Sequence, residues 1–325
     1  SMADVIKQTI DQLLNLVWFC QKINIPYEVY LFTSEVFTTE RGDRSQRHEL
    51  LNGSWKYKHG DGIFENFHLI NVASHKLRKK ELDESLMYLY HLGIEYEDRY
   101  SRMRGDYRED RGDEMGCPPE FYLGTTPLNE SLVVMNKLVP MFKKKYNIEK
   151  LTFITLTDGS SNSNYYINNV VNTEEGLQQS KADTGTPVVK VGKKQYSLGK
   201  SFYGNVTPLL LNVLKDQHGI NTIGFYLAKR IRSWDFDRFV DRKKYRDWDA
   251  RHQKQLEIKK QFNKEKCAIV DKTGYNKYFV INGKTMKVEN TDLSAVNDNM
   301  KTGKIKQLFS KSMKGRIISR TLLNK

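Results

Sequence analysis

Two short motifs, about thirty residues apart, carry side-chain oxygens at the boundaries of predicted elements. Gly124-Thr125-Thr126-Pro127-Leu128 opens an amphipathic helix, and Leu156-Thr157-Asp158-Gly159-Ser160 ends an apolar strand that begins at Leu151. This order places Asp158 at the carboxyl edge of a sheet, where open α/β folds bind their ligands. A hydroxyl at the start of the helix can reach the same edge. Hydroxyl and carboxylate oxygens bind hard cations, so the two motifs together predict a metal site.

Each motif has an ordinary structural interpretation when it is taken alone. Asp-Gly is a common turn sequence. Thr126 followed by Pro127 predicts the start of a helix, with the Thr126 hydroxyl as the cap and Pro127 at the first helical position. Only the pair, in this order and spacing, favours a cation. No general base or nucleophile accompanies the motifs, and the chain has no HExxH zinc motif. The predicted site therefore binds a partner and does not catalyse a reaction.

Hydrophobic periodicity predicts helices and strands in alternation along the chain. Helices are predicted at residues 3–22, around 82–89, at 128–142 and around 209–214, and strands at 27–33, 67–73, 151–156 and 222–227. This order is typical of a doubly wound, mostly parallel, Rossmann-like α/β sheet between layers of helices. The first helix is apolar on most sides, so we expect it to be nearly buried, with Trp18 in the core.

Three polar segments interrupt the pattern and are interpreted as insertions. They are residues 38–64, 97–120 and 160–198; the second is predicted to be an exposed loop, and the third contains two β-like runs. After residue 234 the pattern changes to a long basic helix, and a hairpin is predicted at residues 267–282. We expect one domain over residues 1–290 and a basic helical tail over 291–325.

The net charge of +14 comes almost entirely from two segments. Residues 241–266 hold ten Lys or Arg against five Asp or Glu, and residues 301–325 hold eight Lys or Arg and no acid. Such segments can contact nucleic acid or an acidic protein, although solvated helix faces are the ordinary explanation. The longest apolar run is too short to span a bilayer, and three isolated cysteines indicate reduced thiols. These features favour a cytoplasmic protein without a membrane partner.

Taken together, the motifs resemble the von Willebrand factor A family, and specifically its intracellular members similar to the cobalt-chelatase T subunit and its relatives in tailed bacteriophages. In that family a Mg²⁺ or Mn²⁺ ion sits at the top of a doubly wound sheet. The resemblance assigns the ion to Ser1, Thr126 and Asp158, and it places Thr125, Gly159 and Ser160 where a partner binds. Ser1-Met2 matches the end of the family's first metal loop, since a long helix follows directly.

One departure from the family pattern is large. The first strand, which lies in the middle of the family's sheet, has no counterpart here, and its absence would leave buried backbone groups unsatisfied. We therefore expect the chain to be a fragment that begins inside the metal loop. A cloning-derived Ser-Met start, or a later strand that fills the gap, are the alternatives.

The resemblance implies a metal-ion-dependent protein-binding module. Its partner would be an AAA+ ATPase of the MoxR or cobalt-chelatase kind, which presents an acidic side chain to the ion. A nucleic-acid-binding protein that uses the basic C-terminal helices is the first alternative. A cobalamin-biosynthesis or peptidase-type subunit is the second.

Overall fold

A computed structural model describes the conformation of most of the first 283 residues. The described residues are 5–33, 62–64, 67–105, 126–157, 161, 165–173, 176–181, 188–191, 193–197, 206–228, 235–236, 239–240, 244–271 and 274–283.

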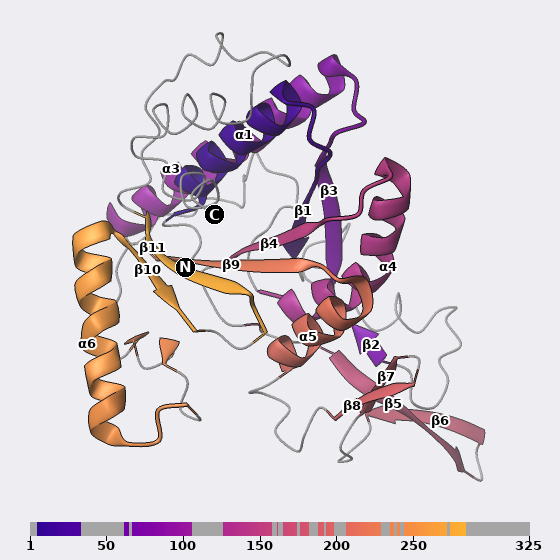
Figure 1. Cartoon of the computed structure of the whole chain (residues 1–325). Helices are drawn as coiled ribbons and strands as arrows, with labels where there is room; N and C mark the ends of the chain where they lie inside the picture. The colour runs from indigo at the N-terminus through magenta and orange to yellow at the C-terminus, as the bar shows by residue number, and fades with distance from the viewer. Residues whose placement is uncertain are drawn as a thin grey trace.

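A four-stranded sheet with the order β10-β11-β9-β4 forms the centre of the described part (Figure 1). Its strands are β4 (Thr152–Thr157), β9 (Asn221–Ala228), β10 (Cys267–Val270) and β11 (Lys277–Asn282). β4, β9 and β11 are parallel, whereas β10 joins β11 as an antiparallel hairpin. The mostly parallel sheet and its helices confirm the α/β class, and the predicted hairpin at residues 267–282 is also confirmed.

Helices lie against both faces of this sheet because the strands are apolar on both sides. On one face, Phe225 of β9 stacks on Phe279 of β11, with ring centroids 5.2 Å apart, and Val5 at the start of α1 (Ile6–Lys22) packs in the same cluster. On the other face, Tyr226 packs with Ile258 and Phe262 of α6 (Trp248–Glu265). Successive side chains of β9 therefore point to opposite faces of the sheet, with Phe225 and Leu227 in the first cluster and Tyr226 in the second.

Gly224 lets two tyrosine rings lie across the middle of β9. A Cβ atom at this position would lie 2.5 Å from the ring of Tyr278 and 2.8 Å from that of Tyr275, closer than side-chain packing allows. Thr155 of β4 donates a hydrogen bond to the Tyr275 hydroxyl at 3.0 Å, and burial raises the pKa of Tyr275 to about 12. The glycine therefore creates the space that ties β4 to the β9–β11 connection.

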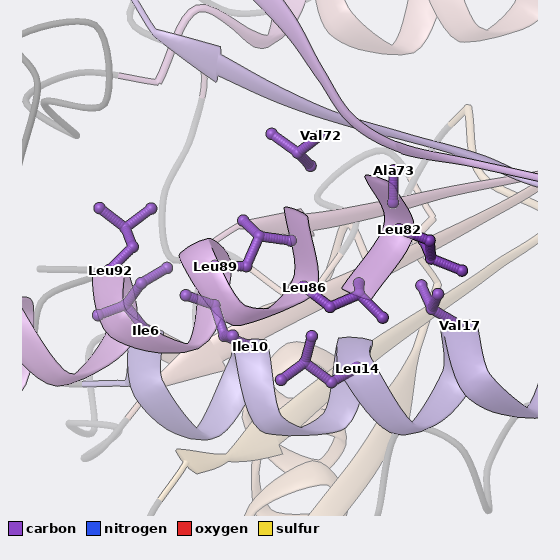
Figure 2. Close-up of a cluster of buried hydrophobic side chains, with 10 residues drawn as sticks. All are labelled: Ile6, Ile10, Leu14, Val17, Val72, Ala73, Leu82, Leu86, Leu89 and Leu92. Carbon is purple, nitrogen blue, oxygen red and sulfur yellow. The ribbon is translucent and has the colours of Figure 1, made fainter. Parts of the chain in front are cut away.

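A second, two-stranded sheet packs against α1 and α3 and forms a further hydrophobic cluster with them. β1 (Glu28–Thr33) and β3 (His68–Ser74) pair with each other in antiparallel orientation. Helices α1 and α3 (Lys79–Gly105) pack against each other and against β3 through aliphatic side chains (Figure 2). These side chains are Ile6, Ile10, Leu14 and Val17 of α1, Leu82, Leu86, Leu89 and Leu92 of α3, and Val72 and Ala73 of β3.

Helix α4 (Leu128–Tyr146) packs over strands of both sheets. Its Leu132, Met135 and Val139 form a cluster with α5 (Val206–His218), and this cluster contacts Tyr30 of β1 and Phe153 of β4. Leu132 is fully buried, with a relative exposure of 0%. The two sheets therefore share one core beneath α4, although β1 and β4 are not hydrogen-bonded to each other.

The carboxylate of Glu28 fastens the end of α4 to the β1–β3 pair. It accepts hydrogen bonds from Lys145 Nζ at 2.7 Å, Asn71 Nδ2 at 2.8 Å, Ser74 Oγ at 2.9 Å and the Tyr146 hydroxyl at 2.9 Å. Its side chain is only 10% exposed. Burial alone would raise the pKa of Glu28, but the hydrogen bonds from its donors outweigh burial, and the pKa is lowered.

Two small antiparallel sheets come from the predicted insertions. β2 (Gly62–Phe64) pairs with β5 (Tyr165–Thr173), which also pairs with β6 (Gly176–Lys181), so the insertions 38–64 and 160–198 meet in one sheet. β7 (Val188–Val191) and β8 (Lys194–Ser197) form a hairpin. The two β-like runs are confirmed, but the contact between the two insertions was not predicted.

Several sequence expectations need correction. Residues 97–105 belong to α3 and not to a loop, because Arg, Met and Glu are good helix formers even without an apolar stripe. Eight of the 17 residues of α1 are buried, so the helix is not nearly buried, and Trp18 is 49% exposed. β1 and β3 form a separate antiparallel pair and are not hydrogen-bonded to the parallel strands β4, β9 and β11. The tail 291–325 lies outside the described residues.

No helix of the described part combines the length and the apolar character needed to cross a membrane. Cys20 and Cys267 are free thiols, and burial raises the pKa of Cys20 to about 11.

Replacing Glu28 with Gln should destabilise the fold by about 1–2 kcal/mol at neutral pH, because a neutral amide accepts weaker hydrogen bonds. A carboxyl whose pKa is lowered on folding contributes stability above its ordinary pKa of about 4.3, and this contribution is lost as the pH falls. The wild type should therefore lose its advantage over E28Q between about pH 6 and pH 3. Urea unfolding across this range measures the difference. Glu81→Gln, in an exposed pair with Arg78, is the matched control and should change little. A pH-independent difference would contradict the assignment.

Candidate functional site

The carboxyl end of β4 lies beside the first turn of α4. The Ser161 hydroxyl, four residues beyond the end of β4 at Thr157, accepts a hydrogen bond from the backbone N–H of Asn129 at 3.1 Å. This contact satisfies a donor that the start of the helix cannot satisfy internally. The end of β4 and the start of α4 therefore meet, as the order of the two motifs predicted.

The start of α5 joins the same edge of the sheet. Thr207, in the first turn of α5, donates a hydrogen bond from its hydroxyl to Asn129 Oδ1 at 2.5 Å. Asn129 bonds Ser161 through its backbone and Thr207 through its side chain, so it connects α4, α5 and the segment after β4. It is only 5% exposed, so these bonds are largely shielded from water. Two helix N-termini, each with a partial positive charge, are thus brought together at the carboxyl edge.

The start of α1 reaches the sheet through Val5, which is 1% exposed. Val5 packs in one cluster with Leu156 near the end of β4 and Leu227 near the end of β9. The parallel strands β4 and β9 end on the same edge of the sheet. The starts of α1, α4 and α5 lie near this edge (Figure 1). These are the elements from which the sequence predicted a binding site.

Of the predicted site residues, the structure describes Thr126 alone. Ser1, Thr125, Asp158, Gly159 and Ser160 lie outside the described residues. Thr126 is half-buried, and its carbonyl accepts a hydrogen bond from the Leu128 N–H at 2.8 Å.

The predicted helix cap is wrong. α4 begins at Leu128, so Pro127 occupies the cap position and not the first helical position, and it offers no side-chain acceptor. The hydroxyl that bonds the first turn belongs to Ser161, far away in sequence, which local sequence rules cannot identify. This arrangement leaves Thr126 outside the helix, at the edge where the metal site was predicted.

Glu130 is the residue of this region that the sequence analysis missed. It lies in the first turn of α4 and is 0% exposed. A carboxylate is favourable near a helix N-terminus, and Glu130 lies four residues after Thr126 in the sequence. Acidic residues in a first helical turn are usually solvated, so the sequence offered no signal of its burial.

The donor set fits a hard cation in its chemistry. Hydroxyls of Ser and Thr with one Asp carboxylate are oxygen ligands, and Mg²⁺ seldom fills its coordination shell with protein groups alone. The described residues contain no group of three His, Cys, Asp or Glu side chains that could hold a metal ion. Soft or borderline metals therefore have no ligand cluster in the part of the chain that the structure covers.

The opposite end of α4 carries a second polar cluster, around His75. Its ring lies edge-on to Tyr27 and Tyr146, with centroids 5.7 and 5.8 Å away, and its Nδ1 is buried without a hydrogen-bond partner. Burial, followed by nearby ionisable groups, raises the pKa of Tyr27 to about 12. The neighbouring Glu28 carboxylate accepts hydrogen bonds from four donors, so its charge stabilises the fold.

No family model matches the chain, and neither a curated protein nor a solved structure matches it. The site is therefore interpreted from its own geometry and chemistry.

Replacing Asn129 with Ala should lower the free energy of unfolding by about 1–2 kcal/mol, because the half-buried Thr207 hydroxyl loses its acceptor. Asn129→Asp keeps an acceptor at a helix N-terminus and should cost clearly less. Guanidinium unfolding of the two variants measures the difference. Equal losses would mean that the bond to Thr207 does not connect the two helices.

Proposed function

We propose that the chain is a metal-ion-dependent protein-binding module of the von Willebrand factor A type. The observation that carries the proposal is the hydrogen bond between Ser161 and the Asn129 N–H, which joins the end of β4 to the start of α4. In the sequence, Thr126 precedes Asn129 by three residues and Asp158 precedes Ser161 by three residues. The parallel order of β4, β9 and β11, with helices on both faces, is compatible with that fold.

Ser1, Thr126 and Asp158 would hold a Mg²⁺ or Mn²⁺ ion at this edge. When bound, such an ion attracts and orients a carboxylate from a partner. Glu130, buried in the first turn of α4, places a carboxyl group at the N-terminus of that helix. Thr125, Gly159 and Ser160 would border the partner's side chain.

The partner we propose is an AAA+ ATPase of the MoxR or cobalt-chelatase kind. This choice rests on the resemblance of the Gly-Thr-Thr-Pro-Leu and Leu-Thr-Asp-Gly motifs to that family. In such an assembly the module would be an adaptor, and ATP hydrolysis would take place on the partner.

Asp158→Asn should weaken Mn²⁺ binding at least about tenfold, because the only proposed carboxylate ligand becomes a neutral amide. Electron paramagnetic resonance of free Mn²⁺ in a titration measures the affinity, and Thr126→Val should also weaken it. Asp216→Asn is the matched control, since Asp216 lies in the second half of α5 and bonds Tyr196 and Lys194. Absence of saturable Mn²⁺ binding to the wild type would remove the metal from the proposal. Binding by D158N equal to that of the wild type would remove the assigned ligand.

Nucleic-acid binding is a second candidate function, favoured by the exposed surface of α6. Trp248 is 65% exposed, and its ring stacks on His252 with an interplanar angle of 4°. Lys259 and Lys260 are exposed farther along the same helix. Aromatic faces and cations on one surface are the features that bind single strands.

Charge reversal of Lys259 and Lys260 to Glu should weaken binding of a single-stranded oligonucleotide and flatten its salt dependence. Trp248→Ala should weaken binding without changing the salt slope, because it removes stacking only. Filter binding between about 50 and 200 mM salt separates the two effects. The double reversal of Lys79 and Lys80 to Glu, at the exposed start of α3, is the charge-matched control. No retention by the wild type at low salt would exclude this function.

A further inference from the structure

Three connections between helices and strands meet at the end of α4, on the edge of the sheet where β4 and β9 begin. They join α1 to β1, β3 to α3, and α4 to β4. His75 of the second connection lies edge-on to Tyr27 of the first and to Tyr146 at the end of α4, with ring centroids 5.7 and 5.8 Å apart. The His75 N–H also donates to the Tyr27 carbonyl at 3.0 Å. The three connections therefore lie side by side, at the opposite end of α4 from the candidate site.

Folding gathers positive charge from these connections onto one surface. Residues 22–28, 74–78 and 143–151 contain seven Lys or Arg and two acids, Glu28 and Glu149. Charge counted along the sequence does not reveal this excess, because it is divided among three short segments. We call this surface the basic edge, and its cations are Lys22, Lys76, Arg78, Lys143, Lys144, Lys145 and Lys150.

The described acids neutralise only part of this charge. Lys145 Nζ lies 2.7 Å from the Glu28 carboxylate, and Arg78 forms an exposed pair with an acid in the first turn of α3. The Lys143 ammonium group donates to the last carbonyl of α5 at 3.0 Å. The remaining cations are exposed and form no ion pair with a described acid; they are Lys22, Lys76, Lys144 and Lys150.

Helix stability explains some of these cations and not others. The lysines at 143–145 and Lys22 lie in the last turns of α4 and α1, where the negative end of a helix favours positive charge. Lys76 and Arg78 instead precede the N-terminus of α3, where positive charge is disfavoured. Lys150 lies outside any helix. A bound anion would offset the repulsion among these groups.

The composition of the basic edge fits phosphate groups better than an acidic protein. Protein–protein interfaces are depleted in lysine and centre on apolar or aromatic anchors. In the three segments of the basic edge, Ile25 is the only large apolar or aromatic side chain that is exposed. The ammonium groups of Lys76 and Lys145 lie over the Tyr146 ring, 5.7 and 5.0 Å from its centroid. Lysines without an open aromatic face suit a nucleic acid duplex, whose bases are already paired and whose charge lies on its phosphates.

We propose that the basic edge binds the phosphate backbone of a nucleic acid duplex without reading its sequence. Its lysines neutralise phosphates and release the counterions bound to them, so the affinity falls as the salt concentration rises. Contacts of this kind position a protein on a duplex but carry no sequence information. The proposal depends neither on the metal site nor on α6, whose exposed Trp248 favours single strands.

The test measures binding of a fluorescent DNA duplex of about 20 base pairs to the full chain, by anisotropy, between about 50 and 200 mM salt. The basic-edge variant combines Lys22→Gln, Lys76→Gln and Lys150→Gln, one cation from each segment. The slope of log K against log salt should become shallower by about 2–3, because each lost phosphate contact removes roughly 0.9. All three side chains are exposed, so the variant should keep the stability of the wild type.

The charge-matched control combines Lys259→Gln, Lys260→Gln and Lys264→Gln, which remove three exposed cations from α6. It should keep the slope of the wild type. No retention of the duplex by the wild type at low salt, or equal slopes for the wild type and the basic-edge variant, overturns the proposal. Tighter binding of polyglutamate than of a duplex of equal charge also overturns it, because the partner would then be an acidic protein.

Discussion

The packing of α4 over two separate sheets is the constraint on which the rest of the structure depends. β1 and β4 share no hydrogen bonds, so the α4 cluster, with Leu132 at its centre, joins the two sheets on this face. The ends of the helix are fixed by polar contacts, Glu28 with Tyr146 at one end and Asn129 with Ser161 at the other. A shift of α4 along its axis would disturb the core, the Glu28 cluster and the candidate site together.

The sequence predicted the existence of most elements because periodicity is a local property. The helices and strands at residues 3–22, 27–33, 67–73 and 222–227 appear within a few residues of their expected limits. Pairing between elements is not local, and there the sequence was less informative. It gave no indication that β2 pairs with β5, or that the hairpin of β10 and β11 extends the parallel sheet.

The same distinction applies to the candidate site. The order of the motifs correctly predicted that the end of β4 would meet the start of α4, because parallel strands end on one edge. The hydroxyl that bonds the first turn of α4 could not be predicted, since Ser161 and Asn129 become neighbours only after folding. Burial of Glu130 follows from the packing of α4 and α5, and no local pattern distinguishes it from a solvated first-turn acid.

The electrostatics of this edge restrict what can bind there. Two helix N-termini each contribute roughly half a positive charge, which favours anions and opposes a cation. A divalent ion requires compensating carboxylates, and Asp158 and the buried Glu130 are the acids that lie in or beside the two motifs. If a divalent ion binds there as proposed, an incoming acidic side chain would interact favourably with the ion and with both helix ends. Preference for an acidic partner would then have two physical origins, and chelation of the ion would remove only one of them.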